Sequence, residues 1–89
     1  MKNPATREMM AALYRLVEKY ETIPDDKIGT DTETMIEYFT PIVADCEAFV
    51  RMYPESILAS ELIHAFYCAA SQSYKEAQEK FLQDHEKNA

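Results

Sequence analysis

Glycine is almost absent from this chain, because Gly29 is the only one among 89 residues. A fold built from many short strands would need repeated Gly, Asn or Asp turns, so an all-β fold is excluded. A glycine-rich loop that cradles phosphate is excluded for the same reason, which argues against enzymatic nucleotide chemistry. A hydrophobic content of 47% is nevertheless enough for one core, and a chain of this length cannot build two.

Basic residues are also scarce. The chain has 9 Lys and Arg against 16 Asp and Glu, a formal net charge of −7, whereas a surface that binds nucleic acid directly needs positive charge. Most of the excess lies in residues 31–60, where six acids and the single base Arg51 give a net charge of −5. We therefore expect no direct contact with nucleic acid, and a basic protein surface as the complementary partner.

Cysteines are few and apolar runs are short. Cys46 and Cys68 lie in periodic apolar segments without the close spacing of a metal or redox motif, so we expect both to be reduced. The longest uninterrupted apolar run extends only from Ala65 to Ala70, whereas a membrane-spanning helix takes about 20 residues. The N-terminal segment has charges where a signal peptide has an apolar stretch. These features predict a cytoplasmic protein that does not enter a membrane.

The spacing of the apolar residues predicts one all-α domain over residues 1–89, a small antiparallel bundle of three main helices. We place these helices at about 4–21, 31–53 and 57–84. Prolines end the first two, because Pro24 and Pro54 push the residue before them out of the helical conformation.

Polar residues mark two of the helix starts. Thr30 and Glu33 have the spacing of a capping box, in which each side chain accepts a backbone N–H of the other residue. Ser56 is placed to cap the third helix. Two tyrosines, Tyr14 and Tyr38, are expected at the edges of the apolar arcs, where a ring can be buried while its hydroxyl stays in water.

Pro41 interrupts the second predicted helix, where it removes one intrahelical hydrogen bond. Either the helix continues with a kink at Pro41, or it stops near Phe39 and restarts with Thr40 as a cap. The apolar phase passes through Pro41 unbroken, which favours the continuous, kinked helix. The core stripe of this helix is Met35, Phe39, Ile42, Cys46, Phe49 and Tyr53, and Ile36, Val43 and Val50 flank it at every seventh residue.

The first predicted helix is too short to cover the third, whose apolar arc approaches half of the helix circumference. A lone three-helix bundle does not need an arc of that width. We therefore expect self-association through the third helix, as a homodimer.

The second predicted helix has an acidic side opposite its apolar stripe. Glu33, Glu37 and Glu47 share a narrow arc, with Asp45 further round. On the same side Ala44, Ala48 and Met52 recur at every fourth residue, a small apolar ridge that could seat another helix. An acidic face can serve solubility alone. Its functional interpretation is a protein–protein interaction module without catalytic activity or cofactor, an inhibitor or adaptor that binds a basic partner through Glu33, Glu37, Asp45, Glu47 and Met52.

A metal- or small-ligand-binding bundle is the alternative function. Glu61 and His64 have the Glu-x-x-His spacing of carboxylate-bridged di-iron bundles, and Cys68 lies one turn from His64. Such a site needs a second Glu-x-x-His pair, which only a homodimer interface could supply from this sequence. In a monomer, Glu61 and His64 are expected to be a solvated pair.

Overall fold

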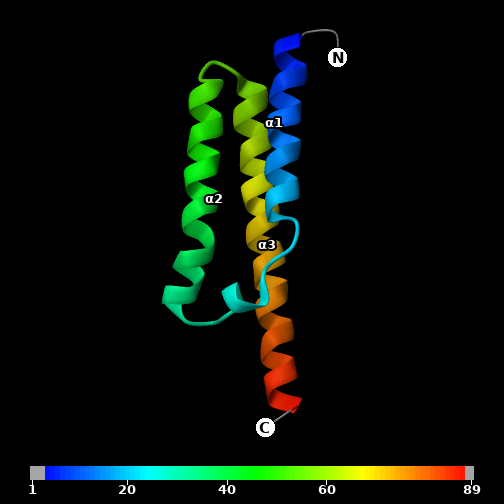
Figure 1. Ribbon diagram of the computed structural model, residues 1–89, viewed down its shortest axis with the longest axis vertical. Helices are drawn as coiled ribbons and strands as arrows, with labels where there is room; N and C mark the ends of the chain where they lie inside the picture. Colours follow the sequence, from blue (N-terminus) through cyan, green and yellow to red (C-terminus); the bar gives the residue numbers. More distant parts are fainter. Residues whose placement is uncertain (1–3, 88–89) are drawn as a thin grey trace.

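The computed structural model describes residues 4–87 and shows, over that range, three α-helices, one short 3-10 turn and no strand (Figure 1). The elements are α1 (Pro4–Tyr20), η1 (Asp25–Lys27), α2 (Thr32–Met52) and α3 (Ile57–Lys87). The chain runs along α1, returns along α2 and turns again into α3, so α2 is antiparallel to both of its neighbours. The predicted all-α bundle is confirmed. No helix in the described range is long and apolar enough to cross a membrane.

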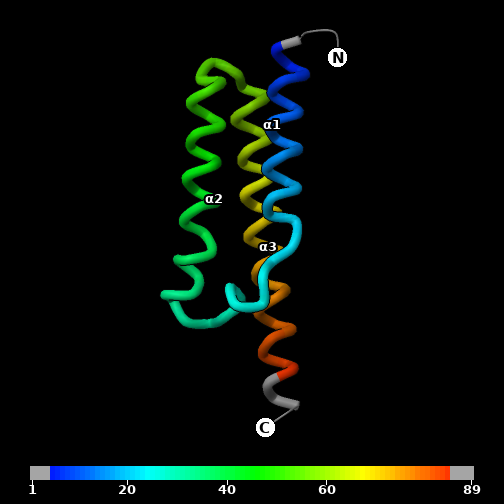
Figure 2. The backbone as a smooth tube through the Cα atoms, in the orientation of Figure 1, coloured from blue at the N-terminus to red at the C-terminus, as the bar shows by residue number. Residues whose placement is uncertain are grey.

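The molecule is elongated because α3 is much longer than its neighbours. It measures 55 × 23 × 17 Å, with a radius of gyration of 15.7 Å, whereas a compact domain of this length has about 12 Å. Figure 2 shows that the C-terminal part of α3 continues past the end of α1 and past the connection between α1 and α2. The first helix is thus too short to cover the third, as the sequence predicts.

Two groups of buried side chains form the core. One lies where the first halves of α1 and α3 meet the end of α2, and consists of Met9, Phe49, Ala59 and Ile63. The other lies where the first half of α2 meets the middle of α3, and consists of Tyr38, Ile42 and Tyr74. Cys46 and Phe66 pack against both groups and so join them into one core.

Asp31 caps α2, one residue later than the predicted capping box. Its carboxylate accepts hydrogen bonds from the Thr34 backbone N–H at 3.0 Å and the Thr34 hydroxyl at 2.7 Å. The predicted capping box of Thr30 and Glu33 is therefore wrong. Asp31 caps the helix in place of Thr30, because a carboxylate is a stronger acceptor than a hydroxyl and is stabilised by the positive end of the helix. The same bonds hold the pKa of Asp31 below its ordinary value. At α3, by contrast, the Ser56 hydroxyl accepts from the Ala59 N–H at 3.0 Å, which confirms the predicted cap.

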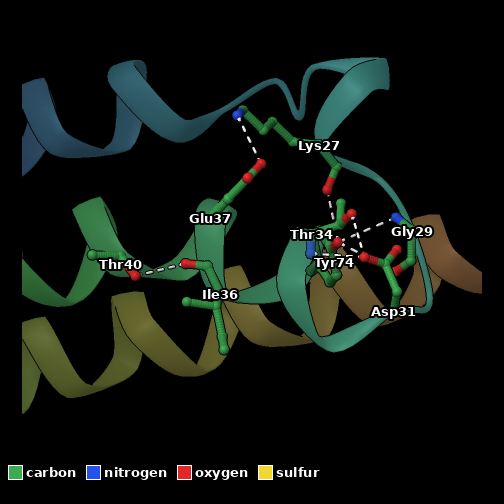
Figure 3. A network of polar contacts seen from close by, with 8 residues as sticks. All are labelled: Lys27, Gly29, Asp31, Thr34, Ile36, Glu37, Thr40 and Tyr74. Carbon is green, nitrogen blue, oxygen red and sulfur yellow. Dashed lines mark hydrogen bonds and ion pairs between the residues drawn. The ribbon is translucent and has the colours of Figure 1, made fainter.

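The second helix passes through Pro41 without interruption. The alternative in which it stops near Phe39 and restarts at Thr40 is wrong, and the kink at Pro41 is not confirmed. Thr40 does not start a new helix but lies within α2, and its hydroxyl donates to the Ile36 carbonyl one turn earlier at 2.7 Å (Figure 3). The core residues on either side of Pro41, Tyr38 and Ile42, hold both halves of the helix against the bundle.

Tyr74 fixes the connection between α1 and α2 to α3. Its hydroxyl donates to the Lys27 carbonyl at 2.7 Å and accepts from the Gly29 N–H at 3.3 Å (Figure 3). Gln78, one turn later, donates to the Gly29 carbonyl at 2.8 Å. The ring of Tyr38 stacks on that of Tyr74, with centroids 4.8 Å apart. Tyr38 is therefore buried, and its predicted place at the edge of the apolar arc is wrong. Tyr14 differs from the same expectation in the opposite direction, because it is 64% exposed and most of the residue lies in solvent.

Gly29 lies in this connection, close to the start of α2. A Cβ atom at this position would come within 2.9 Å of Asp31 Oδ1 and 3.1 Å of Thr34 Cγ2. The sole glycine thus lets the connection approach the capped start of α2 while its N–H and carbonyl reach Tyr74 and Gln78.

Replacing Tyr74 by Phe is expected to lower the free energy of unfolding by about 1–3 kcal/mol, because it leaves buried backbone groups of the connection without their partner. Urea denaturation measures the change. The matched control is Tyr67→Phe on the same helix, where the residue is 37% exposed and the change should stay below about 0.5 kcal/mol. Equal losses in the two variants would show that the Tyr74 hydroxyl does not hold the connection.

Candidate functional site

The outward side of α2 is acidic. Glu33, Glu37 and Glu47 are all exposed there, and we call these three residues the acidic face. Met52, near the end of the helix, is 65% exposed, and Ala44 and Ala48 of the small apolar ridge are exposed as well. Four of the five predicted partner-binding residues are therefore accessible on this helix.

The acidic face has two weak ion pairs. Lys27 Nζ lies 3.5 Å from Glu37 Oε2, and Arg51 Nη2 lies 3.8 Å from Glu47 Oε2. All four side chains are between 38% and 80% exposed. Exposed pairs of this kind contribute about 0–1 kcal/mol, so both bases can be exchanged for a cation of another molecule at little cost. No base among residues 5–84 lies within ion-pair distance of Glu33.

Asp45, the fifth predicted residue, faces α1 instead. Its Oδ2 atom is 2.8 Å from Lys19 Nζ and also accepts a hydrogen bond from the Tyr20 hydroxyl. The side chain is 29% exposed. Both bonds favour the carboxylate and hold the pKa of Asp45 below its ordinary value, the bond from Lys19 more than that from Tyr20. Asp45 therefore joins α2 to the end of α1 and lies apart from the acidic face.

The residues of the alternative site are exposed. Glu61, His64 and Cys68 lie on the outer side of α3, with 3.6 Å between His64 Nε2 and Cys68 Sγ. In the part of the chain that the structure describes, no group of three or more His, Cys, Asp or Glu residues is placed to hold a metal ion. The other cysteine, Cys46, is half-buried, and burial raises the pKa of its thiol, which disfavours the nucleophilic thiolate.

A second exposed surface, of apolar residues, lies beside the acidic face. Ile36, Val43 and Val50 of α2 are 57%, 39% and 40% exposed, and Tyr67 of α3 is 37% exposed. At one end of this surface is an open groove of about 640 Å³, lined by Ile36, Phe39, Tyr67 and Lys75 among others. The sequence places the three α2 residues beside the core stripe, but it does not predict that they stay in solvent.

Comparison with models of known protein families, with curated protein sequences and with solved structures finds no match for this chain.

Asp45→Asn should reduce stability at neutral pH, by an amount that shrinks in acid. A carboxylate with a lowered folded-state pKa stabilises the fold fully above its ordinary pKa near 3.8, and this contribution is lost as the pH falls through the lower folded value. The difference in unfolding free energy between wild type and Asp45→Asn should therefore be constant above about pH 5 and shrink below about pH 4. Denaturation curves across this range measure it.

Glu47→Gln provides the control for this pH series. It removes a carboxylate from the same helix whose ion pair with Arg51 is long and exposed, so its effect should stay below about 0.5 kcal/mol throughout. A difference for Asp45→Asn that persists unchanged down to pH 2 would contradict the assigned role of this carboxylate.

Proposed function

We propose that this chain is a protein–protein interaction module without catalytic activity, whose acidic face docks on a basic surface of another protein. The observation that carries the proposal is the exposure of Glu33, Glu37 and Glu47 on one side of α2, in a stretch of sequence with a net charge of −5. An inhibitor or an adaptor would use such a face in the same way, by covering the partner's basic surface.

The energetics of the acidic face support binding to a cation. Glu33 and Glu37 are like charges one helical turn apart, an arrangement that disfavours the isolated helix. A basic partner relieves this repulsion and adds long-range attraction that speeds encounter. The pairs of Glu37 with Lys27 and of Glu47 with Arg51 are long and exposed, so little is lost when the partner's bases replace Lys27 and Arg51.

The rigidity of α2 supports the same conclusion. The helix is capped by Asp31, buried at Tyr38, Ile42 and Phe49, and tied to α1 through Asp45. Its carboxylates are therefore presented on a fixed backbone, and binding does not have to order the segment that carries them. Beside them, the exposed Met52 offers an apolar contact of the kind that is enriched at protein interfaces.

The combination of Glu37→Lys and Glu47→Lys is expected to abolish partner binding and leave the fold intact. Proteins that the immobilised wild type retains from a cell extract are identified, purified and measured by calorimetry as isolated pairs. We expect the double variant to bind at least about tenfold more weakly, and the wild-type Kd to rise with salt.

The matched control is Glu8→Lys with Glu18→Lys. These two exposed residues of α1 have the same separation along the chain as Glu37 and Glu47, and the control changes the net charge by the same amount. It should bind within about threefold of wild type, because long-range charge alone acts weakly in physiological salt. A partner that binds the Glu37/Glu47 variant as tightly as wild type, or that loses affinity equally for both variants, would refute the acidic face as the binding site.

A further inference from the structure

Three exposed apolar residues of α2 form a straight row. Ile36, Val43 and Val50 are spaced at every seventh residue and are 57%, 39% and 40% exposed. Tyr67 of α3, 37% exposed, lies beside them, with its ring centroid 6.2 Å from that of Phe39. We call Ile36, Val43, Val50 and Tyr67 the apolar stripe. A seven-residue spacing keeps these branched apolar side chains on one side of the helix, where a second helix can pack along them.

The surface area of the chain is larger than a monomer of this mass needs. It exposes 6606 Å², whereas a compact 10.3 kDa monomer exposes about 5,400 Å². A stable protein–protein interface removes about 800 Å² from each partner. The elongated shape of the chain, in which the end of α3 is uncovered, accounts for part of this excess. The excess is nevertheless larger than what one side of a stable interface removes, and the apolar stripe is an exposed apolar surface that spans two helices.

We propose that a second copy of this chain covers the apolar stripe, in a two-fold symmetric dimer whose axis passes at the level of Val43 and Tyr67. The α2 helices of the two copies then lie antiparallel, as do the α3 helices. These four helices form a layered bundle in which every neighbour is antiparallel, with each α1 on the outside. This inference does not depend on the function proposed above, because it rests on the apolar stripe. The two share one residue of the acidic face, Glu33, which the dimer would pair with Arg51 of the second copy.

The antiparallel direction follows from the charges beside the apolar stripe. On α2, Arg51 lies eight residues after Val43, and Glu33 lies ten residues before it on the same side of the helix. A two-fold axis at Val43 therefore brings Arg51 of each copy to Glu33 of the other. A parallel two-fold arrangement would place both Arg51 side chains at one end of the dimer and both Glu33 side chains at the other, so these opposite charges would not meet between the two copies.

The charges on α3 have the same symmetry. Lys75, which lines the groove beside the apolar stripe, lies eight residues after Tyr67, and Glu61 lies six residues before it. The axis that pairs Arg51 with Glu33 on α2 thus also brings Lys75 of one copy near Glu61 of the other. On both helices, apolar residues lie near the axis and opposite charges lie on either side of it. A second copy related by this axis therefore meets apolar residues at the centre and opposite charges at the two ends.

The groove between α1 and α3 is the competing surface for a dimer, and it corresponds to the self-association through the third helix that the sequence predicts. It measures about 400 Å³, and Val17, at its edge, is 42% exposed. Among the described residues, Glu21 is the only charged side chain that lines it. A second copy finds no opposite charge there, so the groove lacks the self-complementarity of the apolar stripe.

Two valines of nearly equal exposure test the proposal. Val43→Lys introduces a charge into the apolar stripe, and Val17→Lys does the same at the α1/α3 groove. Sedimentation equilibrium should give twice the 10.3 kDa chain mass for the wild type and for Val17→Lys, and the single chain mass for Val43→Lys. Far-UV circular dichroism checks that both variants are helical. A monomeric wild type at 100 μM, or a dimer that survives Val43→Lys and dissociates in Val17→Lys, would overturn the proposal.

A charge exchange tests the direction of the two copies. Arg51→Glu should weaken the dimer about tenfold, because it sets two carboxylates against each other at both symmetric contacts. Adding Glu33→Arg to the same chain should restore the dimer, whereas Glu33→Arg alone should weaken it. Dimerisation that is equally weak in the double variant and in Arg51→Glu would overturn the antiparallel arrangement.

Discussion

The hydrogen bonds of the buried Tyr74 hydroxyl determine where α2 begins. Tyr74 binds the Lys27 carbonyl and the Gly29 N–H, and Gln78 binds the Gly29 carbonyl, so two side chains of α3 hold the backbone of the connection. Ile23 of the connection packs against the same core group as Tyr74. The capped start of α2 follows immediately. Because these polar groups are removed from water, breaking one bond leaves its partner unsatisfied, and the connection has little freedom to adopt another position. The direction in which α2 presents its outer residues depends on this contact.

A second polar contact fixes the other side of α2. Asp45 accepts hydrogen bonds from Lys19 and Tyr20 at the end of α1, about midway along α2. The helix is therefore held by α3 at its start and by α1 near its centre, and its rotation about its own axis is determined. One side faces the core, a second carries the acidic face, and a third carries Ile36, Val43 and Val50. Asp45, which the sequence places with the binding residues, thus orients the helix that carries them.

The fold could be predicted because its signals are local. Apolar periodicity marks the three helices, and prolines and Ser56 mark their ends, all within a few residues of the features that they determine. What could not be predicted depends on residues far apart in sequence. Tyr38 is buried because Tyr74 stacks on it, and Asp45 is paired because Lys19 and Tyr20 of α1 lie opposite it. The exposure of Val43 and Val50 also depends on distant parts of the chain. Periodicity shows that this side of the helix is apolar, but whether another helix covers it depends on how the bundle is arranged.

The continuity of α2 through Pro41 links the fold to both proposals. A helix that stopped at Phe39 and restarted at Thr40 would rotate its second half relative to the first, and Ile36 would no longer be in line with Val43 and Val50. The acidic face would be divided in the same way, with Glu33 and Glu37 on one piece and Glu47 on the other. Pro41 removes the hydrogen bond to the Glu37 carbonyl, but Tyr38 and Ile42 remain packed in the core on either side of it. Burial of these two side chains thus offsets the cost of the proline and keeps both outer surfaces of the helix in register along its whole length.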